Sequence, residues 1–404
     1  MPIGYLLAVG VVALGMMLAV RPLGRSGWRG TISWFVSVVP NESPFVAFYW
    51  ATAVTLLALA QGDLGSPVAW VGLGLAGAGF AGTPILVARS LRARTVVEDA
   101  LRRALGPDWR DGIERPRSGR PSWLRILFAP VPLFRRDVRR VKNISYGAAG
   151  RQNRLDVYRR RSGASGGPIL IHLHGGYFRG GWKSLEARPL LHRLASRGWL
   201  CISANYRLQP AAVFPDYLID VKKAIAWARE RAREHGAVPD NVFLAGSSAG
   251  AHLAVTAALT EDDPAFQPGF ESADTTVAAA IGLYGYYGSV DSRRQPLPSS
   301  PVDYAHPDAP PILIAHGDQD TFPGVPPEHA RAFVQKLRRA GANPVVYVEL
   351  PGAQHSFDLF HSIRFETLID GIEDFAAWVC AEVPRPFSRV EGSKRSTGQL
   401  ERST

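Results

Sequence analysis

A turn at residues 246–250 holds the residues best suited to covalent chemistry, because its sequence G-S-S-A-G matches the pattern G-x-S-x-G. The apolar stretch 242–245 predicts a strand before this turn, and the Ala-rich stretch after it predicts a helix. Between a strand and a helix, the central serine of this pattern adopts a strained conformation that holds its hydroxyl clear of the sheet. Ser248 is therefore the predicted nucleophile, whereas Ser247 is expected to pack in the turn.

A serine hydroxyl becomes nucleophilic only when a histidine takes its proton and a carboxylate orients that histidine. After a turn of this kind, the acid and then the histidine follow in chain order. His355 lies on a loop between the last predicted strand and the last predicted helix, and it is the predicted base, with His361 as the alternative. Two aspartates follow the penultimate strand. Asp320 is the predicted acid and Asp318 the alternative, since one or two residues of loop geometry decide between them.

Attack on a carbonyl group creates an oxyanion, which needs hydrogen-bond donors that are already in place. The N–H of Ala249, next to the serine, is one predicted donor. Gly175 and Gly176 follow the predicted strand 169–174, and without side chains they allow further backbone N–H groups to turn into the site. The competing interpretation is an ordinary Gly-Gly turn at a strand end.

The elements that must position these residues alternate between strands and helices. Strands are predicted at 154–158, 169–174, 200–204, 242–245, 277–283, 312–316 and 345–350. Helices are predicted at 216–234, 249–259, 328–340 and 363–381. Such alternation indicates an α/β fold with a mainly parallel sheet covered on both faces. We assign residues 141–383 to this catalytic domain, and the polar tail 384–404 is expected to be disordered.

Three apolar runs precede the catalytic domain, at residues 3–20, 44–60 and 67–88. Each is close to the roughly 20 residues that cross about 30 Å of hydrocarbon, so residues 1–88 are predicted to hold about three transmembrane helices. Arginines before the second run and after the third predict a multi-pass protein with its catalytic domain in the cytoplasm. Two alternatives remain open. The first run could be a signal peptide. The third could be a re-entrant or interfacial hairpin, which would place the catalytic domain on the other face of the membrane.

The net charge of +11 lies mostly beside these apolar runs, because residues 21–142 hold 17 Arg and one Lys against eight Asp and Glu. This placement favours the lipid bilayer over nucleic acid as the partner of the basic residues. The basic segment 89–140 is interpreted as a connector that lies on the headgroup surface, serves as a lid or forms a solvated helical linker. A Pro- and Ser-rich insertion at 285–311 is a second candidate for the rim of the site.

No cofactor or metal site is predicted. Residues 72–77 read G-L-G-L-A-G and match the dinucleotide-binding pattern, but they lie inside an apolar run and not between a strand and a helix. Small residues that let helices pack closely in lipid explain this pattern better. The two cysteines, Cys201 and Cys380, indicate neither a disulfide framework nor a zinc site.

From about residue 141 to residue 381 the chain resembles the esterase and lipase branch of the α/β hydrolases, which includes hormone-sensitive-lipase-like and BD-FAE-like enzymes. The resemblance is carried by the motifs H-G-G-Y at 174–177, N-Y-R-L at 205–208, G-S-S-A-G-A-H at 246–252, H-G-D-Q-D at 316–320 and G-A-Q-H at 352–355. The N-terminal spans together with this domain also resemble membrane-associated esterases of the mycobacterial lipase group and plant isoprenylcysteine methylesterase-like proteins.

The resemblance implies a mainly parallel eight-stranded sheet and carboxylic-ester hydrolysis without a cofactor. It also implies oxyanion donors at Gly176, Tyr177 and Ala249. Tyr177 stands where the commoner form has a third glycine, and the stretch 321–327 after the acid carries extra residues. The expected function is hydrolysis of acyl-ester or lipid-derived substrates through an acyl-enzyme. The alternatives are a serine peptidase or amidase of the same fold, and a non-catalytic binding protein.

Overall fold

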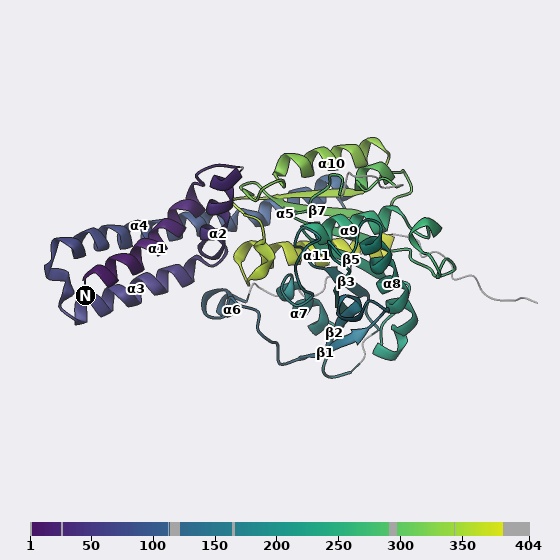
Figure 1. The fold of residues 1–404 in the computed structure, drawn as a ribbon, viewed down its shortest axis with the longest axis horizontal. Coiled ribbons are helices and arrows are strands. Elements are labelled where there is room, and N and C mark those ends of the chain that lie inside the picture. Colours follow the sequence, from purple (N-terminus) through teal and green to yellow (C-terminus); the bar gives the residue numbers. More distant parts are fainter. Residues whose placement is uncertain are drawn as a thin grey trace, which may run out of the picture.

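The computed structural model describes residues 2–25, 27–111, 113, 122–163, 166–290, 297–342 and 344–382. Figure 1 shows two parts, a rod of helices at the N-terminal end and an α/β body that holds the rest of the described chain. The predicted tail, 384–404, lies outside the described residues.

The body is built on one eight-stranded sheet in the order β1-β2-β4-β3-β5-β6-β7-β8. β2 pairs antiparallel with β1 and β4, and all other pairs are parallel. The mainly parallel sheet expected from the sequence is therefore confirmed. The strands are β1 (Val138–Ser145), β2 (Arg154–Arg160), β3 (Ile169–Leu173), β4 (Leu200–Ala204), β5 (Val242–Ser247), β6 (Ala279–Leu283), β7 (Ile312–Gly317) and β8 (Val345–Leu350).

Helices cover both faces of the sheet because alternate strand residues point to opposite sides. In β3, Ile169 and Ile171 belong to one apolar core, whereas Leu170 belongs to the other. The first core is closed by α8 (Asp216–Arg231), α9 (Ala249–Leu259) and α10 (Pro327–Arg339). The second is closed by α5 (Ala93–Leu105), α7 (Arg188–Ser196) and α11 (Ile363–Glu382).

The packing of α5 differs from the connector predicted for residues 89–140. Its Val97 and Leu101 are buried in the core shared with α11, and Val97 lies directly against Gly371. The other positions of α5 hold arginines and acidic residues, so the segment as a whole is polar although one side of the helix is buried. The body therefore includes residues well before 141, and its first strand begins at Val138.

The rod consists of α1 (Pro2–Val20), α3 (Pro44–Ala60) and α4 (Pro67–Leu91) (Figure 1). By length and composition α1 and the helical stretch Pro67–Leu105, which begins with α4, could each cross a membrane, and the bent pair α2–α3 could count as a third span. The glycines of α4 let α1 approach closely, since a Cβ at Gly72 would lie 2.6 Å from the Tyr5 ring. The pattern at 72–77 lies within α4, as the helix-packing interpretation requires.

Helix α2 (Gly27–Glu42) connects the rod to the body and has no counterpart in the sequence predictions. Figure 1 shows it at the junction of the two parts. It is amphipathic: one side exposes large apolar residues and the other buries small or polar ones. The exposed residues are Trp28, Ile32, Phe35 and Val39, and the buried ones include Gly30, Ser33, Ser37 and Asn41.

Buried polar contacts fix the end of α2 to the body. Arg364 of α11 is fully buried and donates to the Glu42 carboxylate at 3.1 Å and to the carbonyl oxygen of Asn41 at 2.9 Å. The Asn41 amide donates in turn to the carbonyl oxygen of Gly352 at 2.9 Å. Since breaking a buried ion pair is strongly destabilising, these contacts fix the end of α2 on the body directly before the start of α3.

Candidate active site

Ser248 occupies the turn between β5 and α9 with φ 54° and ψ −114°, a sparsely populated conformation for a residue with a side chain. Two glycines make the turn possible. A Cβ at Gly246 would lie 2.1 Å from the carbonyl oxygen of Gly250, and one at Gly250 would lie 2.1 Å from that of Leu173. These contacts are with backbone atoms, so larger residues would force the strand and helix apart.

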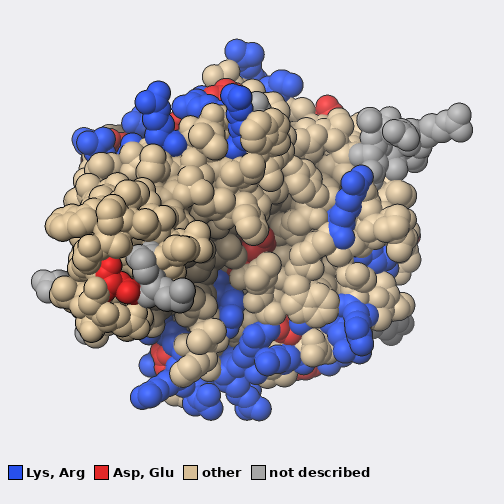
Figure 2. All heavy atoms as spheres, turned by 60° about the vertical axis from the view of Figure 1, so that its left-hand side comes forward, with Lys and Arg blue, Asp and Glu red and all other residues tan. Residues whose placement is uncertain are grey.

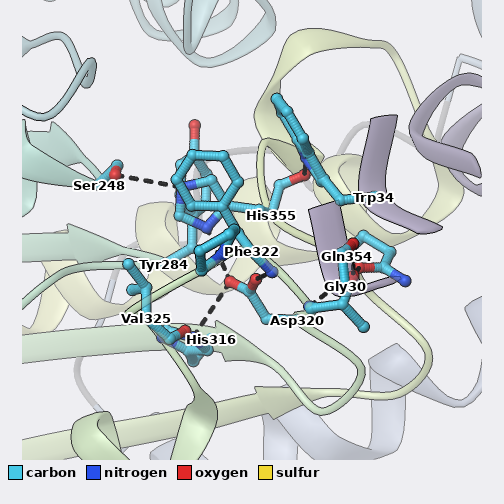
Figure 3. Close-up of polar contacts among 12 residues, drawn as sticks. Gly30, Trp34, Ser248, Tyr284, His316, Asp320, Phe322, Val325, Gln354 and His355 are labelled. Carbon is cyan, nitrogen blue, oxygen red and sulfur yellow. Dashed lines mark hydrogen bonds and ion pairs between the residues drawn. The ribbon is translucent and has the colours of Figure 1, made fainter. Parts of the chain in front are cut away.

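The structure brings Ser248, His355 and Asp320 into one hydrogen-bonded row (Figure 3). His355 Nε2 lies 3.1 Å from Ser248 Oγ, and His355 Nδ1 lies 2.8 Å from Asp320 Oδ2. All three are buried, with 7%, 3% and 1% of Ser248, His355 and Asp320 exposed. The row has the connectivity that a serine nucleophile, its base and an orienting acid require.

Asp320 is held in its charged form by two histidines. Burial alone would raise its pKa, but His355 and His316 outweigh burial and lower the pKa to about 2. His316 Nε2 lies 3.2 Å from the same carboxylate oxygen that faces His355. The carboxylate therefore remains an acceptor throughout the neutral range.

The two alternative residues lie elsewhere. Asp318 Oδ1 accepts from the N–H of Gly352 at 2.6 Å and so supports the loop that carries His355. His361 Nδ1 lies 2.5 Å from Glu366 Oε1. The geometry thus places Asp320 and His355 next to the serine and leaves Asp318 and His361 in supporting positions.

The predicted oxyanion donors divide into two groups. The N–H groups of Gly176, Tyr177 and Ala249 have no hydrogen-bond partner among the described residues. The N–H of Gly175, which was also predicted to be a donor, instead donates to Glu186 Oε2 at 2.5 Å. The prediction that Gly175 is an oxyanion donor is therefore corrected, because its N–H already donates to Glu186. Its lack of a side chain leaves room for the loop that carries the other donors.

A buried polar network lies beneath the serine turn. Ser247 Oγ donates to Asp358 Oδ2 at 2.6 Å and lies 3.0 Å from His172 Nε2. The Tyr284 hydroxyl donates to the other oxygen of Asp358 at 2.5 Å, and its ring meets the edge of the His355 ring at 4.6 Å between centroids. Ser247 therefore does more than fill the turn, because it links the turn to Asp358 and Tyr284, which lie next to His355.

Glu186 holds the loop that carries the unpartnered N–H groups of Gly176 and Tyr177. It could not be predicted from the sequence because it belongs to no recognised motif. Burial, with a contribution from Asp358, raises the pKa of the Glu186 carboxyl group above its ordinary value. We expect Glu186→Ala to lower kcat for ester hydrolysis about tenfold or more, because Gly175 loses its acceptor and the adjacent donors lose their alignment.

Glu186→Gln is the matched control for this experiment, since an uncharged amide retains an oxygen that can accept from Gly175. It should keep most of the wild-type kcat when kcat, KM and thermal unfolding are measured together. Equal activity losses in the alanine and glutamine variants would contradict the positioning role.

Helix α2 and the stretch after Asp320 cover the site. The Trp34 indole N–H donates to the carbonyl oxygen of His355 at 3.1 Å, and Thr321 Oγ1 donates to the carbonyl oxygen of Gly30 at 3.0 Å (Figure 3). The Phe322 ring stacks on the His355 ring at 4.1 Å, and the Trp34 ring meets Phe322 edge-on at 4.7 Å. Thr321 and Phe322, which follow Asp320, and Gly30 and Trp34 of α2 therefore form a cover over the site, which we call the roof.

This roof differs from both predicted candidates, the segment 89–140 as lid and the insertion 285–311 as rim, because it is formed by α2 and the residues after Asp320. The spacing of Trp28, Ile32, Phe35 and Val39 places them on one face of a helix, and this periodicity could have revealed α2. The described part of the insertion instead packs on α10, where the Tyr287 and Phe333 rings stack at 4.3 Å.

Known proteins share both parts of this chain. The BD-FAE family model matches residues 155–296. The probable carboxylic ester hydrolase LipM of Mycobacterium tuberculosis is 37% identical over 94% of this chain and 94% of its own length. Esterase LipQ of the same organism is 40% identical over 70% of this chain and 74% of its own. Among solved structures, an inhibited esterase B of Lactobacillus rhamnosis covers 61% of this chain and 88% of its own with a TM-score of 0.52 at 18% identity, a likeness of fold alone.

Proposed function

The chain belongs to the α/β-hydrolase esterases, and on that premise we propose that it hydrolyses carboxylic esters with Ser248 as nucleophile, His355 as base and Asp320 as orienting acid. The observation that carries the proposal is the pair of hydrogen bonds that joins the three buried side chains, at 3.1 Å and 2.8 Å. The relatives named above are ester hydrolases, which favours an ester over a peptide as substrate.

The first half of the reaction forms an acyl-enzyme. His355 Nε2 takes the proton from Ser248 Oγ while its Nδ1–H donates to Asp320, and the serine oxygen attacks the ester carbonyl carbon. The oxygen of the tetrahedral intermediate lies among the N–H groups of Gly176, Tyr177 and Ala249, which have no other partner among the described residues. The C–O bond to the alcohol then breaks, and His355 gives its proton to the leaving oxygen.

The second half releases the acid. His355 removes a proton from water, which attacks the acyl-serine carbon, and the same N–H groups stabilise the second oxyanion. The bond to Ser248 Oγ breaks, the serine recovers its proton from His355, and a carboxylic acid leaves.

We further propose that the rod crosses a membrane and holds the body at its cytoplasmic surface, where lipid-derived esters are the substrate class. The arginines that follow α1 and those at the end of α4 lie at the end of the rod that meets the body, since Arg89 donates to the carbonyl oxygen of Val20 at 2.9 Å. Because basic flanks favour the cytoplasmic side, this end is expected to face inward.

One labelling experiment tests the serine and the orientation separately. A membrane-impermeant fluorophosphonate is applied to the full chain in detergent, in right-side-out vesicles and in inside-out vesicles, and the labelled peptide is mapped by mass spectrometry. We expect modification of Ser248 in detergent and in inside-out vesicles, with no label in Ser248→Ala protein. Absence of label in folded, solubilised protein would contradict the proposed nucleophile. Label in right-side-out vesicles would reverse the orientation alone.

A further inference from the structure

A cavity of about 340 Å³ on the body has a strongly basic lining that the proposed reaction does not use. Neither the triad nor the predicted oxyanion residues line it, and its lining contains no acidic residue. Five arginines line it together with Tyr158: Arg135, Arg136, Arg140, Arg161 and Arg188. Figure 2 shows Lys and Arg side chains gathered along the lower part of the molecule, the level at which β1 lies in Figure 1.

Acidic neighbours balance only part of this charge. Arg135 pairs with Asp137 at 2.8 Å, and Arg140 pairs with Asp156 at 2.5 Å. The other three have no carboxylate partner within the described ranges. Arg161 Nε donates to the carbonyl oxygen of Arg136, and Arg188 donates to that of Leu133. The cavity therefore retains an excess of positive charge.

Two buried donors in the cavity wall lack a partner. The Tyr158 hydroxyl and Arg188 Nε are both buried and make no hydrogen bond in the part of the chain that the structure describes. Tyr158 is 0% exposed. A buried polar group without a hydrogen-bond partner destabilises the folded protein, so two such groups in the wall of a basic cavity favour a ligand that completes the site.

The electrostatics agree with an anionic ligand. Burial lowers the pKa of Arg188; Tyr158 opposes this shift, and the positive charge of Arg140 adds a smaller lowering effect. An anion in the cavity would relieve the repulsion between these guanidinium groups. A phosphate group has several acceptor oxygens and can accept hydrogen bonds from the Tyr158 hydroxyl and from the guanidinium groups together.

A second cavity and helix α6 (Trp123–Phe128) connect this cavity to the rod. The second, smaller cavity shares Leu133, Phe134 and Arg135 with it and is also lined by Arg125 of α6. In α6, Trp123, Leu124 and Phe128 are exposed, and the Phe128 ring stacks on Tyr49 of α3 with 6.0 Å between centroids. Exposed aromatic residues next to arginines are typical of segments that lie at the level of lipid headgroups.

We propose that this arginine-lined cavity binds a phosphate group, presented by the headgroup of an anionic phospholipid or by a soluble phosphate ester. The proposal does not depend on the triad, because the cavity and its two unpartnered donors are separate from it.

The test uses the full chain and two probes, phosphatidylglycerol in phosphatidylcholine nanodiscs and glycerol phosphate in detergent. Binding is measured by native mass spectrometry and by thermal stabilisation. Tyr158→Phe removes only the unpartnered hydroxyl and keeps the ring, so the unliganded protein should fold as before while phosphate binding weakens about tenfold. Arg188→Gln should weaken it by at least as much.

The matched control is Arg231→Gln, which removes the same charge from an exposed arginine paired with Glu234. It should bind both probes as the wild type does. Binding of phosphatidylglycerol that glycerol phosphate cannot compete for identifies the headgroup as the ligand, and equal binding of glycerol phosphate identifies a soluble ester. Wild-type binding in both cavity variants, or an equal loss in Arg231→Gln, would overturn the proposal.

Discussion

Replacement of Ser248 by alanine should reduce kcat for hydrolysis of a short acyl ester by about 10⁴-fold or more while leaving the fold intact. The expected loss is large because both halves of the proposed reaction pass through a bond to Ser248 Oγ. The positive φ at this position comes from the turn and its glycines, which the substitution leaves unchanged. Activity is measured with the full chain in detergent, and circular dichroism and thermal unfolding report on the fold.

Ser247→Ala is the control, because it removes a hydroxyl from the adjacent residue of the same turn. Ser247 Oγ donates to Asp358 and not to His355, so its loss should disturb the support of the site with a much smaller effect on kcat. A Ser248→Ala protein that hydrolyses the ester at the wild-type rate would refute the proposed nucleophile.

The sequence predicted the parts of the structure that depend on local pattern. Each of the seven predicted strands overlaps an observed strand, because a strand buried on both faces reads as a short apolar run between turns. The missing strand, β1, pairs antiparallel at the edge, is interrupted by a bulge and is mostly accessible to solvent. Its mixture of arginines and valines gave no such run.

The elements that were missed are defined by their partners. Helix α5 is buried on the side that faces β8 and α11. Helix α2 takes its place because Arg364, more than 300 residues later in the chain, binds its last turn. The spacing of apolar residues along the chain can predict that a helix has an apolar face. It cannot predict which part of the protein that face packs against.

The same distinction applies to the site. Ser248, Asp320 and His355 could be predicted because the chain order of this fold constrains them. Glu186, Asp358 and Tyr284 reach the site from loops and strand ends where no spacing rule applies, and Trp34 reaches it from the N-terminal segment. These four residues can be recognised only after the sheet order has brought their elements together.

The position of α2 connects the two proposals about the enzyme. Its buried side holds the carbonyl oxygen of His355 through Trp34, while its other side exposes Trp28 and Phe35, 68% and 73% exposed. A helix that is apolar on its outer face suits the bilayer surface, and α2 lies beside the rod that we propose to cross a membrane. On that proposal, the helix that covers the site also contacts the membrane, which favours substrates that partition into lipid.

Asp320→Asn should lower kcat by about 10⁴-fold, because an amide can donate to His355 Nδ1 and so stabilise the tautomer that cannot accept the serine proton. It also removes the charge that stabilises the imidazolium formed in each half of the reaction. The measurement is kcat and KM for the same ester at a pH where the wild type is fully active.

Asp318→Asn provides the matched control, since the amide oxygen can still accept from the N–H of Gly352 and the loop should remain in place. Its kcat should stay within about tenfold of the wild-type value, because the substitution weakens at most one hydrogen bond that holds the loop of His355. The opposite order, with the larger loss in Asp318→Asn, would assign the acid to Asp318 and refute the geometry described above.

The same pair of variants should differ in acid stability. The folded-state pKa of Asp320, about 2, lies below its ordinary value of 3.8, so its charged form stabilises the folded protein above pH 3.8. That contribution, on the order of 2 kcal/mol, is lost as the pH falls from 3.8 toward 2. Unfolding free energy measured between pH 5 and 2 should therefore fall less steeply in Asp320→Asn than in wild type. In Asp318→Asn this part of the pH dependence should remain, because the two histidines still hold Asp320 in its charged form.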